Sequence, residues 1–227
     1  MPLLVLYELA AFALAGDAVS GVRNGADVLL KSLFLTLGGR QGLLLFNALL
    51  LGGFAVLVWR DMRKSGGRLV PGVFAGMMAE SVLGGLVFGV VAGSITAVLL
   101  GGIPHLALAQ MSSLSLATQL TISLGAGIYE ELLFRVLLVG ALVLLGQRVF
   151  GWRPLAAGVF ATLLGAFLFS AFHYVGPYGD PLELGSFMFR LVAGLLFSGM
   201  YLLRGLGITA WTHALYDVFL TVMLAGG

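Results

Sequence analysis

Long apolar runs constrain this chain more than any other feature. Most are close to the ~20 residues that an α-helix needs to cross the hydrocarbon of a bilayer. They are continuously apolar and lack the alternation of a β-barrel strand, so helices are the expected spanning structure. The runs predict an all-α, polytopic transmembrane bundle of about six to eight helices, with the active site in a cavity between helices. They are Leu43–Trp59, Val73–Leu100, Leu114–Gly146, Leu155–Phe172, Ser186–Leu203 and Ile208–Leu224.

The composition supports lipid as the surroundings of the chain. Hydrophobic residues make up 60% and charged residues 10%, whereas a soluble domain carries about 25% charged residues. The length of 227 residues fits a single membrane domain, 1–227. The net charge of +2 makes nucleic acid an unexpected partner. The absence of cysteine excludes disulfides, a thiol nucleophile and thiolate metal sites.

The N-terminal part of the chain has a weaker pattern. Met1–Ala15 is apolar but short and carries Glu8, and Ala26–Leu37 is shorter still and carries Lys31. We expect residues 1–41 to form one or two peripheral helical segments, and residues 114–225 to form the catalytic helical core. No basic residue precedes the first apolar run, so no cleavable signal peptide is expected.

Basic residues predict the orientation of the spans. Lysine and arginine concentrate in the cytoplasmic loops of membrane proteins. If the spans alternate, the basic residues of three loops fall on one side, which we expect to be cytoplasmic, with the C-terminus on the opposite side. We expect a multi-pass integral protein of the plasma membrane. The residues of this basic side are Arg60, Arg63, Lys64, Arg68, Arg148, Arg153 and Arg204.

Three ionisable residues lie together inside the run Leu114–Gly146. Each such group costs at least ~2.5–3.5 kcal/mol in hydrocarbon, which makes a functional site the default interpretation. Glu131 and Arg135 are four residues apart, so they share a helix face and can form an ion pair. Glu130 points about 100° away on an α-helix and has no such partner. We interpret Glu131 and Arg135 as a supporting pair and Glu130 as the group that takes a proton from water.

Two further apolar runs carry histidine. Phe169 and His173 are four residues apart near the end of one run, so the phenyl and imidazole rings share a helix face. His213 and Asp217 have the same spacing near the start of the last run. A lone intramembrane histidine usually forms a hydrogen bond between helices, but two histidines alongside a glutamate pair favour catalysis. The remaining histidine, His105, stands beside Pro104 and is assigned no role.

These motifs resemble, in order, the three motifs of the type II CAAX prenyl endopeptidase family. They are Glu130-Glu131-x-x-x-Arg135, Phe169-x-x-x-His173 and His213-x-x-x-Asp217. The bacterial members are the CPBP or Abi proteins, intramembrane proteases and bacteriocin self-immunity proteins that include lysostaphin-resistance-like members. The resemblance covers about Ile128 to Leu220.

The resemblance implies an endopeptidase that cleaves a peptide or a lipidated protein at the membrane. Glu130 with His173 would activate a water, and His213 with Asp217 would stabilise the oxyanion. Many relatives have asparagine at the last position, whereas an ionised Asp217 can only accept hydrogen bonds. We therefore expect Asp217 to orient His213. No cofactor is favoured, although zinc is an open alternative that would use Glu130, His173 and His213 as ligands.

Two other functions are consistent with buried ionisable groups. A non-enzymatic member of the family could act as an immunity or scaffold protein, in which these side chains would be replaceable. A transporter or proton pathway could use the same groups, but the chain shows no inverted repeat. Other intramembrane protease classes fit poorly, because neither His-Glu-x-x-His nor Gly-x-Ser-Gly occurs.

The helical pattern leaves one geometric conflict. If every run spans fully, His173 and His213 lie on the order of 15–20 Å apart in depth, given a rise of 1.5 Å per residue. The two histidines could then not act on one substrate. A shorter helix before His173, or a fold-back of residues 174–185 into a shielded cavity, would remove the conflict.

Overall fold

The computed structural model describes residues 2–14, 23–64, 71–102, 114–176 and 179–226, and every regular element in these ranges is helical. By length and composition, four helices are apolar enough to cross a membrane. The all-helical class predicted from the apolar runs is confirmed, and the four candidate spans fit an integral membrane protein, whereas six to eight spans stay a prediction. The four candidate spans are Gly25–Arg60, Pro71–Leu100, Pro154–Phe172 and Leu184–Ala225.

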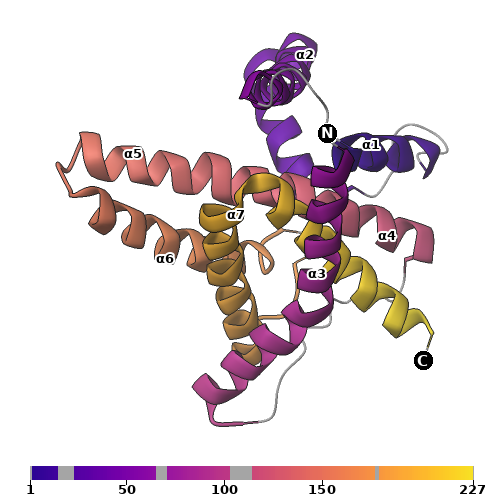
Figure 1. Cartoon of the computed structure of the whole chain (residues 1–227), viewed down its shortest axis with the longest axis vertical. Coiled ribbons are helices and arrows are strands. Elements are labelled where there is room, and N and C mark those ends of the chain that lie inside the picture. The colour runs from indigo at the N-terminus through magenta and orange to yellow at the C-terminus, as the bar shows by residue number, and fades with distance from the viewer. Residues whose placement is uncertain (1, 15–22, 65–70, 103–113, 177–178, 227) are drawn as a thin grey trace.

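Two of the long helices are bent at glycine. Helix α2 (Gly25–Lys64) is interrupted at Gly39, which has a φ of 55°. Helix α7 (Leu184–Ala225) joins the two predicted runs Ser186–Leu203 and Ile208–Leu224, with Gly205 between them at a φ of 79°. Glycine adopts positive φ without the steric penalty that a Cβ brings. The bend at Gly205 lets the two halves of α7 run in different directions (Figure 1).

The predicted run Leu114–Gly146 forms one helical path with an unusual middle. It begins as α4 (Leu116–Gly125), continues as two π-helical segments, η1 (Ala126–Glu130) and η2 (Leu132–Val139), and ends as α5 (Gly140–Arg148). A π-helix has i→i+5 hydrogen bonds and is frequent at functional sites. The Ser115 hydroxyl caps the start of α4 by accepting the Thr118 backbone N–H at 3.3 Å.

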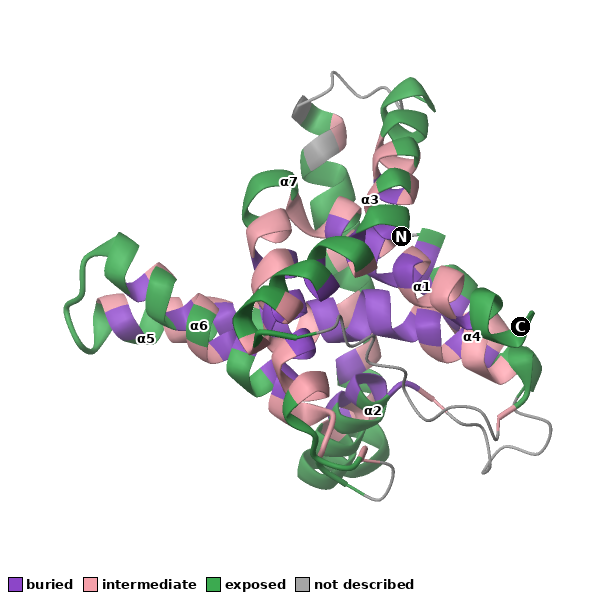
Figure 2. Cartoon of the chain, turned by 90° about the horizontal axis from the view of Figure 1, so that it is seen from below, coloured by how far each residue is buried: buried purple, intermediate pink, exposed green. Residues whose placement is uncertain are grey.

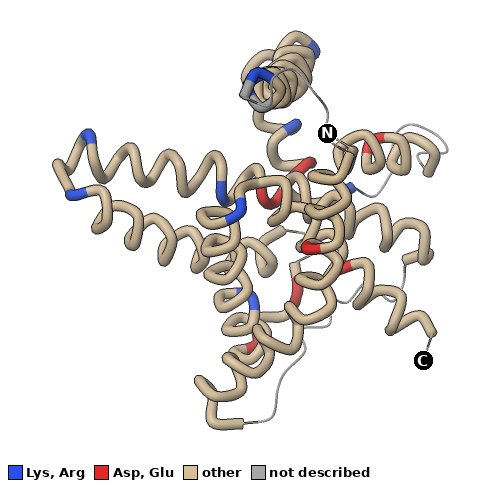
Figure 3. Tube along the Cα trace, viewed as in Figure 1, with Lys and Arg blue, Asp and Glu red and all other residues tan. Residues whose placement is uncertain are grey.

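Helices α5 and α6 (Pro154–Phe172) form a hairpin that extends from the centre of the molecule (Figure 1). Gly151, with a φ of 66°, lies in its turn. Figure 3 shows basic residues at the tip of this hairpin and most other charges nearer the centre. Exposed leucine, valine and phenylalanine side chains cover the hairpin, as lipid-facing helices require.

Helix α3 (Pro71–Leu100) packs closely on the C-terminal half of α7 through glycine. A Cβ on Gly84 would lie 3.0 Å from Thr212 Cγ2, and one on Gly89 would lie 2.8 Å from Tyr216 Cε2. Small residues of this kind allow the backbones of membrane helices to approach each other. This contact places the segment of α7 that carries His213 at the centre of the bundle.

The N-terminal helix α1 (Pro2–Leu14) packs against α4 and η1. Leu3, Leu4, Tyr7 and Ala11 are buried there together with Ile128 and Tyr129. Figure 2 shows buried residues concentrated where the helices cross. The segment that we expected at the periphery, residues 1–41, therefore contributes buried side chains next to η1.

Candidate active site

The π-helical segments carry the glutamate pair. Glu130 ends η1, Glu131 follows it, and Arg135 lies in η2. One turn earlier, a Cβ on Gly127 would lie 2.4 Å from the Ala210 carbonyl oxygen. Glycine at this position therefore allows α7 to pass directly against the helix that carries both carboxylates.

Glu131 and Arg135 form the predicted ion pair, with 3.1 Å between Oε2 and Nε. Their side chains are 0% and 1% exposed. The other Glu131 oxygen, Oε1, accepts a hydrogen bond from His213 Nδ1 at 2.7 Å. Glu131 therefore connects two of the three motifs, a role that the spacing of the residues did not reveal.

Glu130 is buried without a cationic partner in hydrogen-bonding contact. Its Oε1 accepts a hydrogen bond from Asn24 Nδ2 at 2.9 Å. Its Oε2 has no hydrogen-bond partner among the described residues and lies 3.9 Å from His173 Nε2. One oxygen of this carboxylate is therefore fixed, and the other is free next to a histidine.

His173 caps the C-terminal end of α6 with a fixed ring orientation. Its Nδ1 lies 2.9 Å from the Phe169 carbonyl oxygen. Because a carbonyl only accepts, Nδ1 carries the proton, and in the neutral ring Nε2 is left as an acceptor. Glu130 Oε2 and His173 Nε2 are thus two acceptors directed at the same space.

The two histidines lie at one site, which removes the predicted conflict in depth. The Phe169 ring centroid is 5.0 Å from that of His173 and 6.2 Å from that of His213. The bend at Gly205 turns the second half of α7 back toward the end of α6 (Figure 1). The chain after His173 also folds back, because the Asp180 backbone N–H donates to the His173 carbonyl oxygen at 2.9 Å.

Phe169 packs against the charged residues of the site. Its ring lies 4.4 Å from the Arg135 guanidinium carbon, a cation–π distance. The Phe197 ring stacks on the His213 imidazole at a centroid distance of 4.3 Å. The imidazole of His213 therefore has one stacked aromatic neighbour, Phe197, and one edge-on neighbour, Phe169, at 6.2 Å.

Asp217 lies one turn after His213, with its Oδ2 at 3.6 Å from His213 Nε2. This distance exceeds a hydrogen bond, so the bond that holds the ring comes from Glu131. The function of Asp217 as the residue that orients His213 stays a prediction.

A cavity of about 140 Å³ opens onto these groups. Its polar lining includes Glu130, His173, His213 and Asp217. Apolar side chains of α7, including Phe197 and Leu220, form much of the remaining wall. The free atoms of the motif residues therefore face a common space within the bundle.

Two polar residues of the site, Arg190 and Asn24, were not predicted from the sequence. Arg190 lines the cavity and pairs with Asp180, and its guanidinium donates to Ser186 Oγ at 2.9 Å. A charged residue inside the run Ser186–Leu203 was a signal for it. Asn24 had no signal, because its contact with Glu130 joins residues far apart in the chain. His105, Pro177 and Tyr178 lie outside the described residues.

The arrangement does not fit the zinc alternative. Among the described residues, no group of three or more His, Asp or Glu side chains lies where it could hold a metal ion. Glu130 Oε1 and His213 Nδ1 are engaged by Asn24 and Glu131. One donor atom of Glu130 and one of His213 are therefore committed to other partners.

The fold and the site define a helical membrane protein with buried glutamate and histidine side chains around one cavity. Residues 110–219 match the model of the Type II CAAX prenyl endopeptidase Rce1-like family. This match supports the family that the three motifs indicated. The match contains all the motif residues but not Asn24. Comparison with curated proteins and with solved structures gives no match.

Proposed function

We propose that the chain is an intramembrane endopeptidase in which Glu130 and His173 activate the attacking water. The family is one of CAAX-type membrane proteases, which supports this class of reaction. The observation that carries the proposal is the pair of free acceptors, Glu130 Oε2 and His173 Nε2, 3.9 Å apart at the cavity. A single water can donate one O–H group to each acceptor, and Glu130 then takes the proton as general base.

His213 is the proposed donor to the oxyanion. Its Nδ1–H is held by Glu131, so Nε2 is directed toward Asp217 at the cavity wall. When both ring nitrogens carry protons, Nε2–H can donate to the negative oxygen of the tetrahedral intermediate. The carboxylates of Glu131 and Asp217 compensate the positive charge of that ring.

The proposed substrate is a peptide segment of a membrane-associated or lipid-modified protein. The cavity lies within a helical bundle whose outer surface is apolar, so substrates already held in the bilayer have the shortest path to it. The proposed reaction needs no cofactor, since water, a general base and an oxyanion donor suffice for peptide hydrolysis.

Cleavage of a quenched farnesylated CAAX-type peptide by purified protein in lipid tests this function. Wild type, Glu130→Gln and Glu80→Gln should be compared, because Glu80 lies on α3 and pairs with Arg204. We expect Glu130→Gln to lower kcat by about 10² or more, the effect of losing a general base, and Glu80→Gln to retain activity. Equal cleavage by Glu130→Gln would exclude Glu130 as the base.

A second assay tests whether the protein cleaves peptides that carry no prenyl group. If the farnesylated peptide is not cleaved, a mixture of membrane-inserted peptides without a prenyl group should be incubated with wild type and Glu130→Gln. Fragments that form only with wild type would support a peptidase with another substrate. No fragment from either set would favour the non-enzymatic immunity or scaffold alternative.

A further inference from the structure

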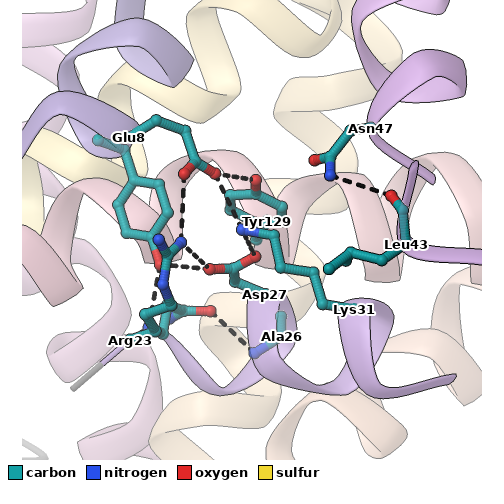
Figure 4. Close-up of polar contacts among 10 residues, drawn as sticks. Glu8, Arg23, Ala26, Asp27, Lys31, Leu43, Asn47 and Tyr129 are labelled. Carbon is teal, nitrogen blue, oxygen red and sulfur yellow. Dashed lines mark hydrogen bonds and ion pairs between the residues drawn. The ribbon is translucent and has the colours of Figure 1, made fainter. Parts of the chain in front are cut away.

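A network of charges and tyrosines connects α1, the start of α2 and η1 (Figure 4). We call it the N-terminal cluster; its members are Tyr7, Glu8, Arg23, Asp27, Lys31 and Tyr129. Asp27 is 0% exposed and is bonded by Arg23 at 2.9 Å and by the Tyr7 hydroxyl at 2.7 Å. Glu8 accepts from the Tyr129 hydroxyl at 2.6 Å. The cluster therefore fixes α1 and α2 to the residue that precedes Glu130.

Asn24 extends this cluster to the active site. Its backbone N–H donates to the Tyr7 hydroxyl at 3.3 Å, and its Oδ1 accepts the Ala26 backbone N–H at 2.9 Å. Because Oδ1 caps the start of α2, the amide group must present Nδ2 to Glu130. The side chain is 3% exposed, so each end of the amide has one fixed partner.

Because Gly125 has no side chain, it leaves room for the contact between Asn24 and Glu130. A Cβ at this position would lie 2.5 Å from Tyr7 Cε2 and 2.7 Å from Asn24 Cβ. Any larger residue would push both side chains away from the helix that carries Glu130. The glycine thus belongs with Tyr7 and Asn24 in one close-packed contact.

We propose that Asn24 is a positioning residue for Glu130 and that the N-terminal cluster holds it in place. Asn24 fixes Oε1, and this orientation turns the free Oε2 toward His173. Arg135 cannot replace it, because Arg135 pairs with Glu131. Residues outside the family match of 110–219 therefore determine the geometry of the general base. The inference rests on the proposed function for its kinetic consequence but not for the contact itself.

The contact is tested without an activity assay by NMR of protein labelled with ¹⁵N-asparagine. The chain has only two asparagines, Asn24 and Asn47, so each side-chain amide is assigned by one substitution. Asn47 donates to the Leu43 carbonyl oxygen within α2 at 3.0 Å and serves as the internal control (Figure 4). We expect Glu130→Gln to shift the Asn24 amide signal and to leave the Asn47 signal in place. An unmoved Asn24 signal would overturn the proposal.

The positioning role is tested by kinetics of Asn24→Ser. Serine is as good an N-cap as asparagine, so α2 keeps its cap while the donor to Glu130 is lost. We expect kcat to fall by about 10-fold to 100-fold, as small displacements of a catalytic group do, with KM and melting temperature close to those of wild type. Asn47→Ser is the matched control and should keep full activity.

The role of the cluster is tested by Tyr7→Phe, which removes only the hydroxyl. We expect a smaller fall in kcat, and no further fall when Tyr7→Phe is added to Asn24→Ser, because both act through one contact. Unchanged kcat in Asn24→Ser, or additive losses in the double variant, would overturn the proposal. If wild type cleaves no peptide, the proposed function fails, whereas the NMR result still decides whether Asn24 holds Glu130.

Discussion

Glu131 and His213 are joined by a hydrogen bond of 2.7 Å between Oε1 and Nδ1. The same carboxylate pairs with Arg135, so the second glutamate of the motif holds one histidine and one arginine at once. Within the part of the chain that the structure describes, Glu130 has a neutral hydrogen-bond partner, Asn24, on one oxygen and none on the other. The two neighbouring glutamates thus have different surroundings. Glu131 is suited to hold His213 and Arg135 in place, and Glu130 is suited to accept a proton.

Removal of the supporting charge should destabilise the protein. Glu131→Gln leaves Arg135 buried without its counter-charge, and breaking a buried pair in this way costs about 3–5 kcal/mol. Unfolding in mixed detergent, followed by circular dichroism, measures this loss. Glu80→Gln is the control, because the Glu80–Arg204 pair is about half exposed, and it should have little effect. Equal stability of Glu131→Gln and Glu80→Gln would contradict a stabilising role for the buried Glu131–Arg135 pair.

Helix contact at Gly127 should tolerate no side chain. In Gly127→Ala the new Cβ would meet the Ala210 carbonyl oxygen and the Ala214 Cβ, at 2.4 and 2.6 Å. Overpacking of this kind costs about 1–3 kcal/mol, and it would also separate Glu131 from His213. We expect a lower melting temperature and reduced kcat. Gly140→Ala on the same helical path has nothing within 4 Å and should retain both values.

Asp217 should be replaceable by asparagine but not by leucine. Asparagine keeps the size of the side chain and a hydrogen-bonding oxygen near His213 Nε2, and it adds a donor. We expect Asp217→Asn to keep kcat within about tenfold of wild type and Asp217→Leu to lose more. Steady-state cleavage of the reporter peptide measures both. Loss of activity in Asp217→Asn equal to that in Asp217→Leu would show that the negative charge itself is required.

Chelators should leave the activity unchanged. The described residues hold no suitable group of three metal-binding side chains, and one donor atom each of Glu130 and His213 has another partner. We expect equal initial rates before and after dialysis against EDTA and 1,10-phenanthroline. A rate that falls on dialysis and returns with added zinc would restore the metal-dependent alternative.

The N-terminal cluster should make stability depend on acid pH. Burial alone would raise the pKa of Glu8, but hydrogen bonds from Tyr129 and Lys31 and the charge of Arg23 lower it below its ordinary value of 4.5. Because the folded pKa is the lower one, the stabilisation is present above the unfolded pKa and is lost as the pH falls through the folded pKa. Glu8 lies on helix α1, which has 13 residues and is therefore too short to span the bilayer.

Melting temperatures of wild type and Glu8→Gln between neutral pH and the acid range test this prediction. The advantage of wild type over Glu8→Gln should be constant near neutrality and should shrink as the pH falls below 4.5, the ordinary pKa of Glu8. Lys31→Met should reduce the same advantage, because Lys31 donates to Glu8 at 3.0 Å. If the advantage of wild type over Glu8→Gln grew toward acid pH, the pKa of Glu8 would not be lowered in the folded protein.

Local patterns were sufficient for two of the long helices and for the Glu131–Arg135 pair. The apolar runs match α3 and α6 nearly residue for residue, because lipid requires each spanning segment to satisfy its own backbone. The pair followed from a spacing of four residues along one helix. The two halves of α7 were also predicted as separate helices, Ser186–Leu203 and Ile208–Leu224, and the structure places the bend at Gly205 between them.

Contacts between distant segments could not be derived in this way. The conflict in depth between His173 and His213 arose from treating each run as a straight, parallel span. The bend at Gly205 and the fold-back after His173 removed it. The hydrogen bond from Asn24 to Glu130 joins positions 106 residues apart, and no local periodicity reports a contact of that kind.

By itself, the sequence predicted a helical membrane protein that resembles one protease family, with Glu130, His173 and His213 as its candidate site. Those properties follow from hydrophobic runs and from spacings within single helices, where the geometry is fixed by the backbone. Only the tertiary structure decided which partner each group has: Asn24 for Glu130, and Glu131 for His213. These partners depend on where glycines such as Gly125 and Gly127 let helices approach, which is a property of packing rather than of local sequence.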